Sequence, residues 1–248
     1  MEVEYVISNA TARNWRKLKP NIRTKLTSRA NKMLSCKMIV PVEYFLNKAN
    51  IPFVQKLVLS IKNNRWEKGD VLFSCAINLI KRAGLIDKKH VESIIIEYSK
   101  TFQLIDELLA VNLPNDEFDI LGIIYQCLLF EGEKNIKGSY YTPKHIAKSM
   151  TRELNFSNGQ TFLDPCCGSG AFLLSLDSAK PCQIFGIDND PIAVMLAKFN
   201  LLLKFRNESF TPQIFCSDYI SQLIVVMSLF GLQFGAIKSD IGFYPMMK

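Results

Sequence analysis

The feature that most constrains the fold of this chain is an alternation of short apolar runs with helical stretches. Runs of strand length lie at residues 161–164, 183–188 and 212–218, and the helical stretches 170–179 and 191–205 separate them. Parallel strands must be joined by a crossover of a dozen or more residues, usually a helix. The βαβαβ rhythm therefore predicts a parallel sheet and an α/β class.

The region before this alternation has a different pattern. Apolar residues recur every three or four positions in residues 52–64 and 91–112, and residues 113–130 read as a turn followed by a capped helix. The sequence thus predicts three parts. These are a basic helix-turn-helix-like element (1–38), a helical region (39–135) and an α/β part (136–248).

Positive charge is concentrated at the N-terminus. The chain has a net charge of +7, and residues 1–38 hold nine lysines and arginines against two glutamates, so they carry the whole excess. Within residues 7–18, Ser8 or Asn9 can cap a helix whose apolar side faces away from a polar side. That polar side consists of Arg13, Asn14, Arg16 and Lys17. The pattern is similar to the second helix of a helix-turn-helix unit and predicts binding to double-stranded DNA. A solvated helix face or a basic tail is the alternative.

The spacing of cysteines and histidines indicates in which redox compartment the protein works and whether a metal site is expected. The seven cysteines include no Cys-x-x-Cys pair, which favours reduced thiols in a cytoplasmic protein. Cys166 and Cys167 are interpreted as small packing residues in a loop. His90 and His145 lack metal-ligand spacing, so no metal site is expected. No secretory signal is recognisable, and the apolar stretch 223–237 is shorter than the roughly 20 residues of a membrane helix.

The stretch FLDPCCGSGAFLL (162–174) places glycines between a predicted strand and a predicted helix. A P-loop would have Gly-Lys-Ser/Thr after the glycines, and a dinucleotide fingerprint would have glycine where Leu173 stands. The remaining interpretation is a loop whose backbone and helix N-terminus approach a ligand. Asp188, at the end of the second strand, can accept hydrogen bonds from both ribose hydroxyls, and Asp218 follows the third. The pattern predicts an adenosine site without a pyrophosphate clamp; a glycine turn in a ligand-free sheet is the alternative.

DPCCGSGAFL also resembles the cofactor motif of adenine-specific (N6) DNA methyltransferases of restriction-modification systems. Residues 186–201 resemble the next motif of that family, 138–150 its Tyr-Thr-Pro segment and 118–129 the helix before it. The resemblance covers residues 113–218. It implies that a helical N-terminal region precedes the first half of a Rossmann-like methyltransferase core that uses S-adenosyl-L-methionine.

The resemblance also implies roles for individual residues around the cofactor. Thr142 and Pro143 would lie at the methionine moiety, with Thr142 near its carboxylate, and Asp164 would lie by its amino group. Gly168 and Gly170 would pass beneath the cofactor, and Phe172 would pack beside it. Asp188 would hold the ribose and Asp218 the adenine amine.

The chain departs from the family at the catalytic motif. The family has Asn/Asp-Pro-Pro-aromatic there, whereas this sequence offers Phe243, Tyr244, Pro245 and Met246, so no catalytic residue is recognisable. We therefore expect a truncated or frame-shifted product or one half of a split enzyme, inactive alone. A second chain that completes the core, or a restriction subunit, would be its partner. A non-catalytic DNA- or cofactor-binding remnant and a protein-glutamine or RNA methyltransferase are the alternatives.

Overall fold

The computed structural model describes residues 42–115, 117–129, 142–154, 156 and 159–217. All of these except Leu129 belong to one compact unit drawn from residues 40–128 and 140–248. The predicted basic helix within residues 1–38 and the segment 218–248 lie outside the described residues. The domain boundaries expected from the sequence stay predictions.

The unit contains a sheet of three parallel strands in the order β1-β2-β3. The strands are β1 (Phe162–Asp164), β2 (Ile184–Asp188) and β3 (Gln213–Cys216). Each matches a predicted strand to within about two residues at either end. The α/β class and the parallel sheet are therefore confirmed.

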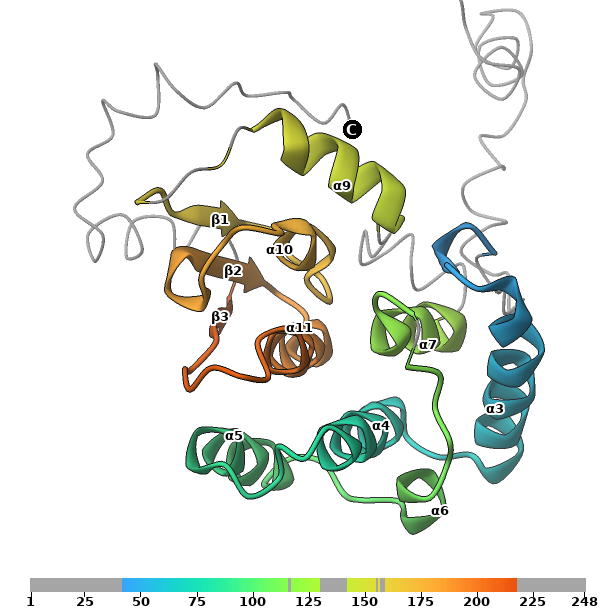
Figure 1. Ribbon diagram of the computed structural model, residues 1–248. Helices are drawn as coiled ribbons and strands as arrows, with labels where there is room; N and C mark the ends of the chain where they lie inside the picture. The colour runs from blue at the N-terminus through green and yellow to red at the C-terminus, as the bar shows by residue number, and fades with distance from the viewer. Residues whose placement is uncertain (1–41, 116, 130–141, 155, 157–158, 218–248) are drawn as a thin grey trace, which may run out of the picture. The chain divides into compact units, whose positions relative to one another are not determined.

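Two crossover helices cover one face of this sheet (Figure 1). Helix α10 (Ala171–Ser175) and the short η3 (Pro181–Gln183) lead from β1 to β2, and α11 (Pro191–Lys204) leads from β2 to β3. Leu173, Val194 and Ala197 from the helices pack against Ile184 and Ile214 from the strands. These side chains form the apolar core of the α/β part.

Helix α10 is shorter than the predicted stretch 170–179, so this part of the prediction is wrong. The Lys204 ammonium group donates hydrogen bonds to the backbone carbonyls of Leu173, Leu174 and Leu176. These carbonyls lie in the last turn of α10 and just after it. Because a side chain of α11 satisfies them, the helix can end early without leaving buried acceptors unpaired.

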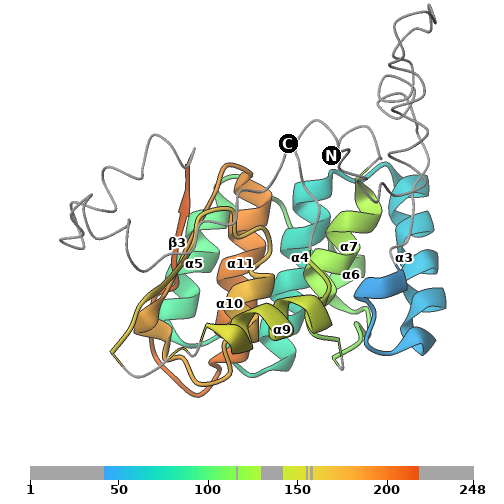
Figure 2. The same ribbon diagram turned by 90° about the horizontal axis from the view of Figure 1, so that it is seen from above.

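Further helices pack against α11 or against one another (Figure 2). They are α3 (Ile51–Asn64), α4 (Lys68–Arg82), α5 (Lys89–Ser99), α6 (Asp106–Leu109) and α7 (Ile120–Leu128), preceded by η1 (Val42–Tyr44) and η2 (Lys48–Asn50). Helix α9 (Lys144–Glu153) packs against α10. No helix in the part of the chain that the structure describes is long and apolar enough to cross a membrane.

Aromatic side chains form the contact of α4 and α5 with α11. The ring of Phe199 lies 6.2 Å from that of Phe73 and 6.1 Å from that of Tyr98, measured between centroids. Phe102 completes the cluster at 6.2 Å from Phe73 and 6.3 Å from Tyr98. Phe73 and Phe199 are fully buried, so this cluster fastens the helical region to the α/β part.

The helical run predicted over residues 91–112 is broken in the structure, which corrects that prediction. Helix α5 ends at Ser99 and α6 begins at Asp106. The backbone N–H of Gln103 donates to Asp70 Oδ1 and that of Ile105 donates to Ser74 Oγ, both at 2.9 Å. Because these acceptors come from α4, the break is a tertiary feature that local periodicity does not reveal.

Candidate functional site

The carboxyl ends of the three strands meet at one edge of the sheet. Strand β1 ends at Asp164, which pairs in register with Gly186, and β2 ends at Asp188, which pairs with Cys216 at the end of β3. The structure therefore brings together two of the three predicted acids. Asp218 lies outside the described residues.

The glycine loop, residues 165–170, connects β1 to α10 at this edge. Gly168 and Gly170 have φ angles of +54° and +96°, which side chains disfavour, and this accounts for both glycines. The N–H of Gly168 donates to Asp188 Oδ2 at 2.8 Å. The open side of Gly170, where a β-carbon would stand, faces Ala197 on α11 at 3.7 Å. That is an ordinary contact distance, so the positive φ angle, and not a lack of space, favours glycine at this position.

The two adjacent cysteines differ from each other. Cys167 is buried, and its N–H donates to the carbonyl of Ile187 at 2.9 Å. A β-carbon on Gly186 would lie only 3.0 Å from the Cys167 sulfur, so glycine on β2 makes room for this side chain. Cys166 is exposed. The packing role is therefore confirmed for Cys167 and wrong for Cys166, because the loop turns the latter toward solvent.

Asp164 is the most unusual acid of the edge. It is 8% exposed, its Oδ1 accepts the N–H of Cys166 at 3.2 Å, and its Oδ2 has no hydrogen-bond partner among the described residues. Burial raises the pKa of Asp164 to about 6, and the nearby negative charge of Asp188 acts in the same direction. A buried carboxylate oxygen without a partner is costly unless a cation or donor meets it. An ammonium group of a ligand would fit this atom.

Asp188 has a structural role beside the predicted one. Its Oδ2 accepts the N–H of Gly168, and its Oδ1 accepts the N–H of Asp190 at 2.9 Å. The side chain is half-buried, and each carboxylate oxygen has a second lone pair. Asp188 can therefore hold the glycine loop and still accept hydrogen bonds from a diol.

The remaining predicted residues lie on α9 and α10 or just before them. Thr142 is half-buried and lines a small cavity that Ala171, at the start of α10, also lines. Pro143 caps α9, and its carbonyl accepts the N–H groups of Ile146 and Ala147, both at 3.0 Å. Phe172 is half-buried on the first turn of α10.

Sequence reasoning missed a group of buried polar side chains behind the glycine loop. Asp119, directly before α7, accepts hydrogen bonds from Ser169 Oγ and from Asn200 Nδ2, the latter at 2.8 Å. Tyr125 on α7 donates its hydroxyl to Asp190. Polar residues inside apolar runs, such as Asn200 in LAKFNLLL, were the available signal, because a buried polar group needs a partner.

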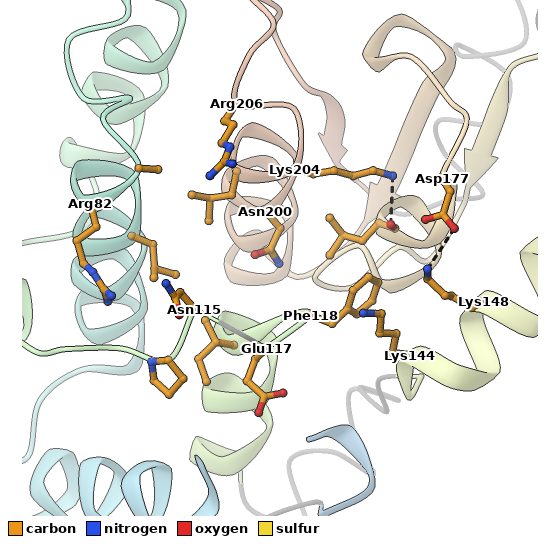
Figure 3. A pocket seen from close by; sticks show the side chains of 16 residues that line it. Arg82, Asn115, Glu117, Phe118, Lys144, Lys148, Asp177, Asn200, Lys204 and Arg206 are labelled. Carbon is orange, nitrogen blue, oxygen red and sulfur yellow. Dashed lines mark hydrogen bonds and ion pairs between the residues drawn. The ribbon is translucent and has the colours of Figure 1, made fainter. Parts of the chain in front are cut away.

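A larger cavity of about 570 Å³ lies between α4, α7, α9, α10 and α11 (Figure 3), and Asn200 is one of the residues that line it. None of the described residues predicted to bind cofactor lines it. Two of its cations are engaged with the protein: Lys148 pairs with Asp177 at 3.1 Å, and Lys204 donates to the three carbonyls described above. Burial lowers the pKa of Lys204 to about 8. The glycine loop and the buried acid Asp164 both lie at the strand ends, so that edge is the candidate site.

Comparison with known proteins agrees with this geometry. Residues 116–222 match the family model described as N-6 DNA methylase. The matched part of the chain is therefore similar to N-6 DNA methylases and is called the N-6 DNA methylase segment below. The match includes α7, α9 and the whole described sheet. The resemblance to restriction-modification DNA methyltransferases drawn from the sequence is confirmed.

Relatives of the N-6 DNA methylase segment come from several microorganisms. The type II methyltransferase M.VspI of a Vibrio species is 40% identical over 84 residues, which are 33% of this chain and 21% of the relative. A type I restriction enzyme methylase subunit, MjaIX, of Methanocaldococcus jannaschii is 35% identical over 97 residues, 35% of this chain and 17% of the relative. The type II restriction enzyme and methyltransferase RM.BcgI of Heyndrickxia coagulans is 40% identical over 111 residues, which are 38% of this chain and 17% of the relative. The chain thus spans about a fifth of the length of these proteins.

The N-6 DNA methylase segment leaves two predicted features outside it. Residues 1–38, with the predicted DNA-binding side chains Arg13, Asn14, Arg16 and Lys17, precede the segment. Residues 243–246, which stand where the catalytic motif was expected, follow it. Both groups lie outside the described residues and stay predictions. The relatives give no support for the RNA or protein-glutamine alternatives.

Proposed function

We propose that the strand-end edge of this N-6 DNA methylase segment binds S-adenosyl-L-methionine, and that the protein serves methyl transfer to the exocyclic amine of adenine in DNA. The observation that carries the proposal is the buried Asp164 Oδ2, which has no partner among the described residues and lies beside the glycine loop. When bound, the cofactor supplies an electrophilic methyl group on a sulfonium centre. Both its ammonium and its sulfonium carry positive charge, which suits an edge with two carboxylates.

In this proposal each predicted residue binds a different part of the cofactor. Asp164 Oδ2 would accept the cofactor's ammonium group, and the free lone pairs of Asp188 would accept the two ribose hydroxyls. Thr142, with Pro143 fixing the start of α9, would face the methionine carboxylate from the other side of the loop. Gly168 and Gly170, which lack side chains, would let the loop backbone pass close beneath the cofactor. Phe172 would pack beside the cofactor, and Asp218 would accept a hydrogen bond from its adenine amine.

The remaining parts of the proposal concern the substrate and the fold. Similarity to methyltransferases and methylase subunits of restriction enzymes supports DNA as the substrate and a restriction subunit as a partner. The three parallel strands would be the first half of a Rossmann-like core. The sequence contains no Asn-Pro-Pro-aromatic motif, so we expect the 248-residue polypeptide to bind cofactor without methylating DNA.

Calorimetric titration with S-adenosyl-L-methionine tests the cofactor assignment. We expect one site per chain in the wild type and a loss of affinity of roughly ten-fold to a hundred-fold in Asp164→Asn, the range for a hydrogen bond to a charged group. Asp177→Asn is the matched control, since Asp177 is an exposed acid that pairs with Lys148 away from the strand ends. Absence of binding by folded wild-type protein, or equal affinity of all three proteins, would refute the assignment.

A further inference from the structure

Helix α7 approaches the glycine loop unusually closely, and a glycine makes this possible. A β-carbon on Gly122 would collide with Asp119 Oδ2 and with Ser169 Oγ. Gly122 lies in the first turn of α7, where its N–H donates to Asp119 Oδ1 at 2.7 Å. Asp119 is thus the cap of α7 and, through its other oxygen, the acceptor for Ser169 of the glycine loop.

Asn200 on α11 closes this contact into a triangle. Its Nδ2 group donates to Asp119 Oδ1 at 2.8 Å and to the carbonyl of Ser169 at 2.9 Å. Both Nδ2 hydrogens are therefore used, and Ser169 is held through its side chain and its backbone. All three side chains are at least nine-tenths buried. Burial raises the pKa of Asp119, and the hydrogen bonds from Ser169, Gly122 and Asn200 oppose that rise.

A second series of hydrogen bonds leads from α7 to Asp188, the acid proposed to hold the ribose. Tyr125, three residues after Gly122, donates its hydroxyl to Asp190 Oδ2. The N–H of Asp190 donates to Asp188 Oδ1 at 2.9 Å, and Asp188 Oδ2 accepts the N–H of Gly168 at 2.8 Å. Helix α7 therefore reaches the glycine loop from both of its sides.

From these contacts we infer that Asp119 and Tyr125 are positioning residues of the cofactor site. Helix α7 thereby fixes the glycine loop and Asp188 in the arrangement that binds the cofactor. Asp119 and Tyr125 contact no proposed ligand atom themselves. Asp119 fixes Ser169, between the two glycines of positive φ, and Tyr125 acts on Asp188 through Asp190. Directional networks of this kind specify one arrangement of the groups they join. The inference rests on the proposed function for its ligand and on the geometry above for the residues.

The test compares three variants of the full chain: Asp119→Ala, Asp119→Asn and the control Asn78→Ala. Asn78 is also buried, and its amide donates to the carbonyls of Leu108, Leu109 and Val111 in the helical region and not to the glycine loop. Both Asn78→Ala, which removes a buried amide, and Asp119→Ala, which removes a buried carboxylate, are expected to destabilise the fold. Only truncation of the Asp119 side chain, in Asp119→Ala, is expected to disturb the loop.

Two readouts separate positioning from stability. Titration with S-adenosylhomocysteine, at a temperature where each protein is folded, should show affinity reduced by roughly ten-fold to a hundred-fold in Asp119→Ala. Asp119→Asn should recover most of this affinity, because the amide keeps one acceptor oxygen and can donate to Ser169 Oγ. Asn78→Ala should bind like the wild type. Hydrogen exchange without ligand should become faster at residues 166–175 in Asp119→Ala and stay unchanged there in Asn78→Ala.

The results for these variants either support or overturn the positioning role of Asp119. Wild-type affinity in folded Asp119→Ala, or an equal loss in Asn78→Ala, would overturn the inference. If Asp119→Ala does not fold, the single-atom changes Tyr125→Phe and Ser169→Ala take its place with the same expected direction. If the wild type binds no ligand, the proposed cofactor is wrong, and exchange at residues 166–175 alone decides whether α7 positions the loop.

Discussion

Helix α11 contacts the helical region through two neighbouring residues of opposite chemistry. Phe199 packs between the rings of Phe73 and Tyr98, whereas Asn200 donates hydrogen bonds to Asp119 and Ser169. Both side chains are buried. The aromatic contact is non-directional and contributes through the apolar area it removes from water. The polar contact is directional and fixes where its partners lie.

The aromatic contact and the polar contact therefore have different roles within one interface. The aromatic side holds the helical region and the α/β part together, and small shifts there change little. The polar side sets the position of the glycine loop, where shifts of a few tenths of an ångström would alter a binding site. Substitutions on the two sides should therefore separate stability from binding.

The largest expected effect is on the aromatic side. Phe199→Ala should lower the free energy of unfolding by about 3–5 kcal/mol, because a fully buried ring is replaced by a cavity. Urea denaturation measures this loss. Phe205→Ala, a half-buried phenylalanine just after the same helix, should cost clearly less. Equal losses in the two variants would contradict the importance assigned to the aromatic cluster.

The second effect concerns Asp164, which lies beside the glycine loop that the polar side positions, and it depends on pH. Burial raises the pKa of Asp164 to about 6, above its ordinary value of 3.8, so the folded state disfavours the ionised form. The wild type should therefore lose stability as pH rises from about 4 to about 6, by at most about 3 kcal/mol. Asp164→Asn should remove this loss and be more stable than the wild type at pH 7.5, but not at pH 4.

Thermal denaturation of both proteins across this pH range provides the measurement. Asp177→Asn serves as the control, since its carboxylate is 67% exposed and its removal should leave the pH dependence unchanged. A wild-type stability that rises between pH 4 and pH 6 faster than that of Asp164→Asn would show that Asp164 has a partner in the folded protein.

The smallest effect compares two tightly packed glycines, one on each side of the interface. Gly122→Ala would push a methyl group into Asp119 and Ser169, and Gly69→Ala would push one into the ring of Phe102. Each should cost about 1–3 kcal/mol as an overpacking change. Only Gly122→Ala should also speed hydrogen exchange in the glycine loop. Faster exchange there in both variants would mean that the two sides are not separable.

The sequence predicted the sheet well because its signals are local. Strand-length apolar runs and a helical period placed β1, β2, β3 and α11, and the glycine motif located the loop between β1 and α10. The capped helix predicted within residues 113–130 is also confirmed as α7, with Asp119 as the cap. Asp164 and Asp188 were recognised as site residues from their positions at strand ends.

Other features depend on contacts between distant residues and were missed for that reason. The break after Ser99 is held by Asp70 and Ser74 of another helix, and the early end of α10 by Lys204 of α11. The link between Asp119 and Ser169 joins residues that are 50 positions apart. No local pattern reveals such pairs, although a buried polar residue in an apolar helix indicates that some partner exists.

The central claim is that Asp164 meets the ammonium group of the cofactor, and a ligand-truncation cycle tests it most directly. Wild type and Asp164→Asn are titrated with S-adenosylhomocysteine, which carries the amino-acid moiety, and with methylthioadenosine, which lacks it. The account predicts that the wild type prefers S-adenosylhomocysteine and that Asp164→Asn reduces this preference by about 1.5–3 kcal/mol. Equal weakening of both ligands by the substitution, or no weakening of either, would contradict the claim.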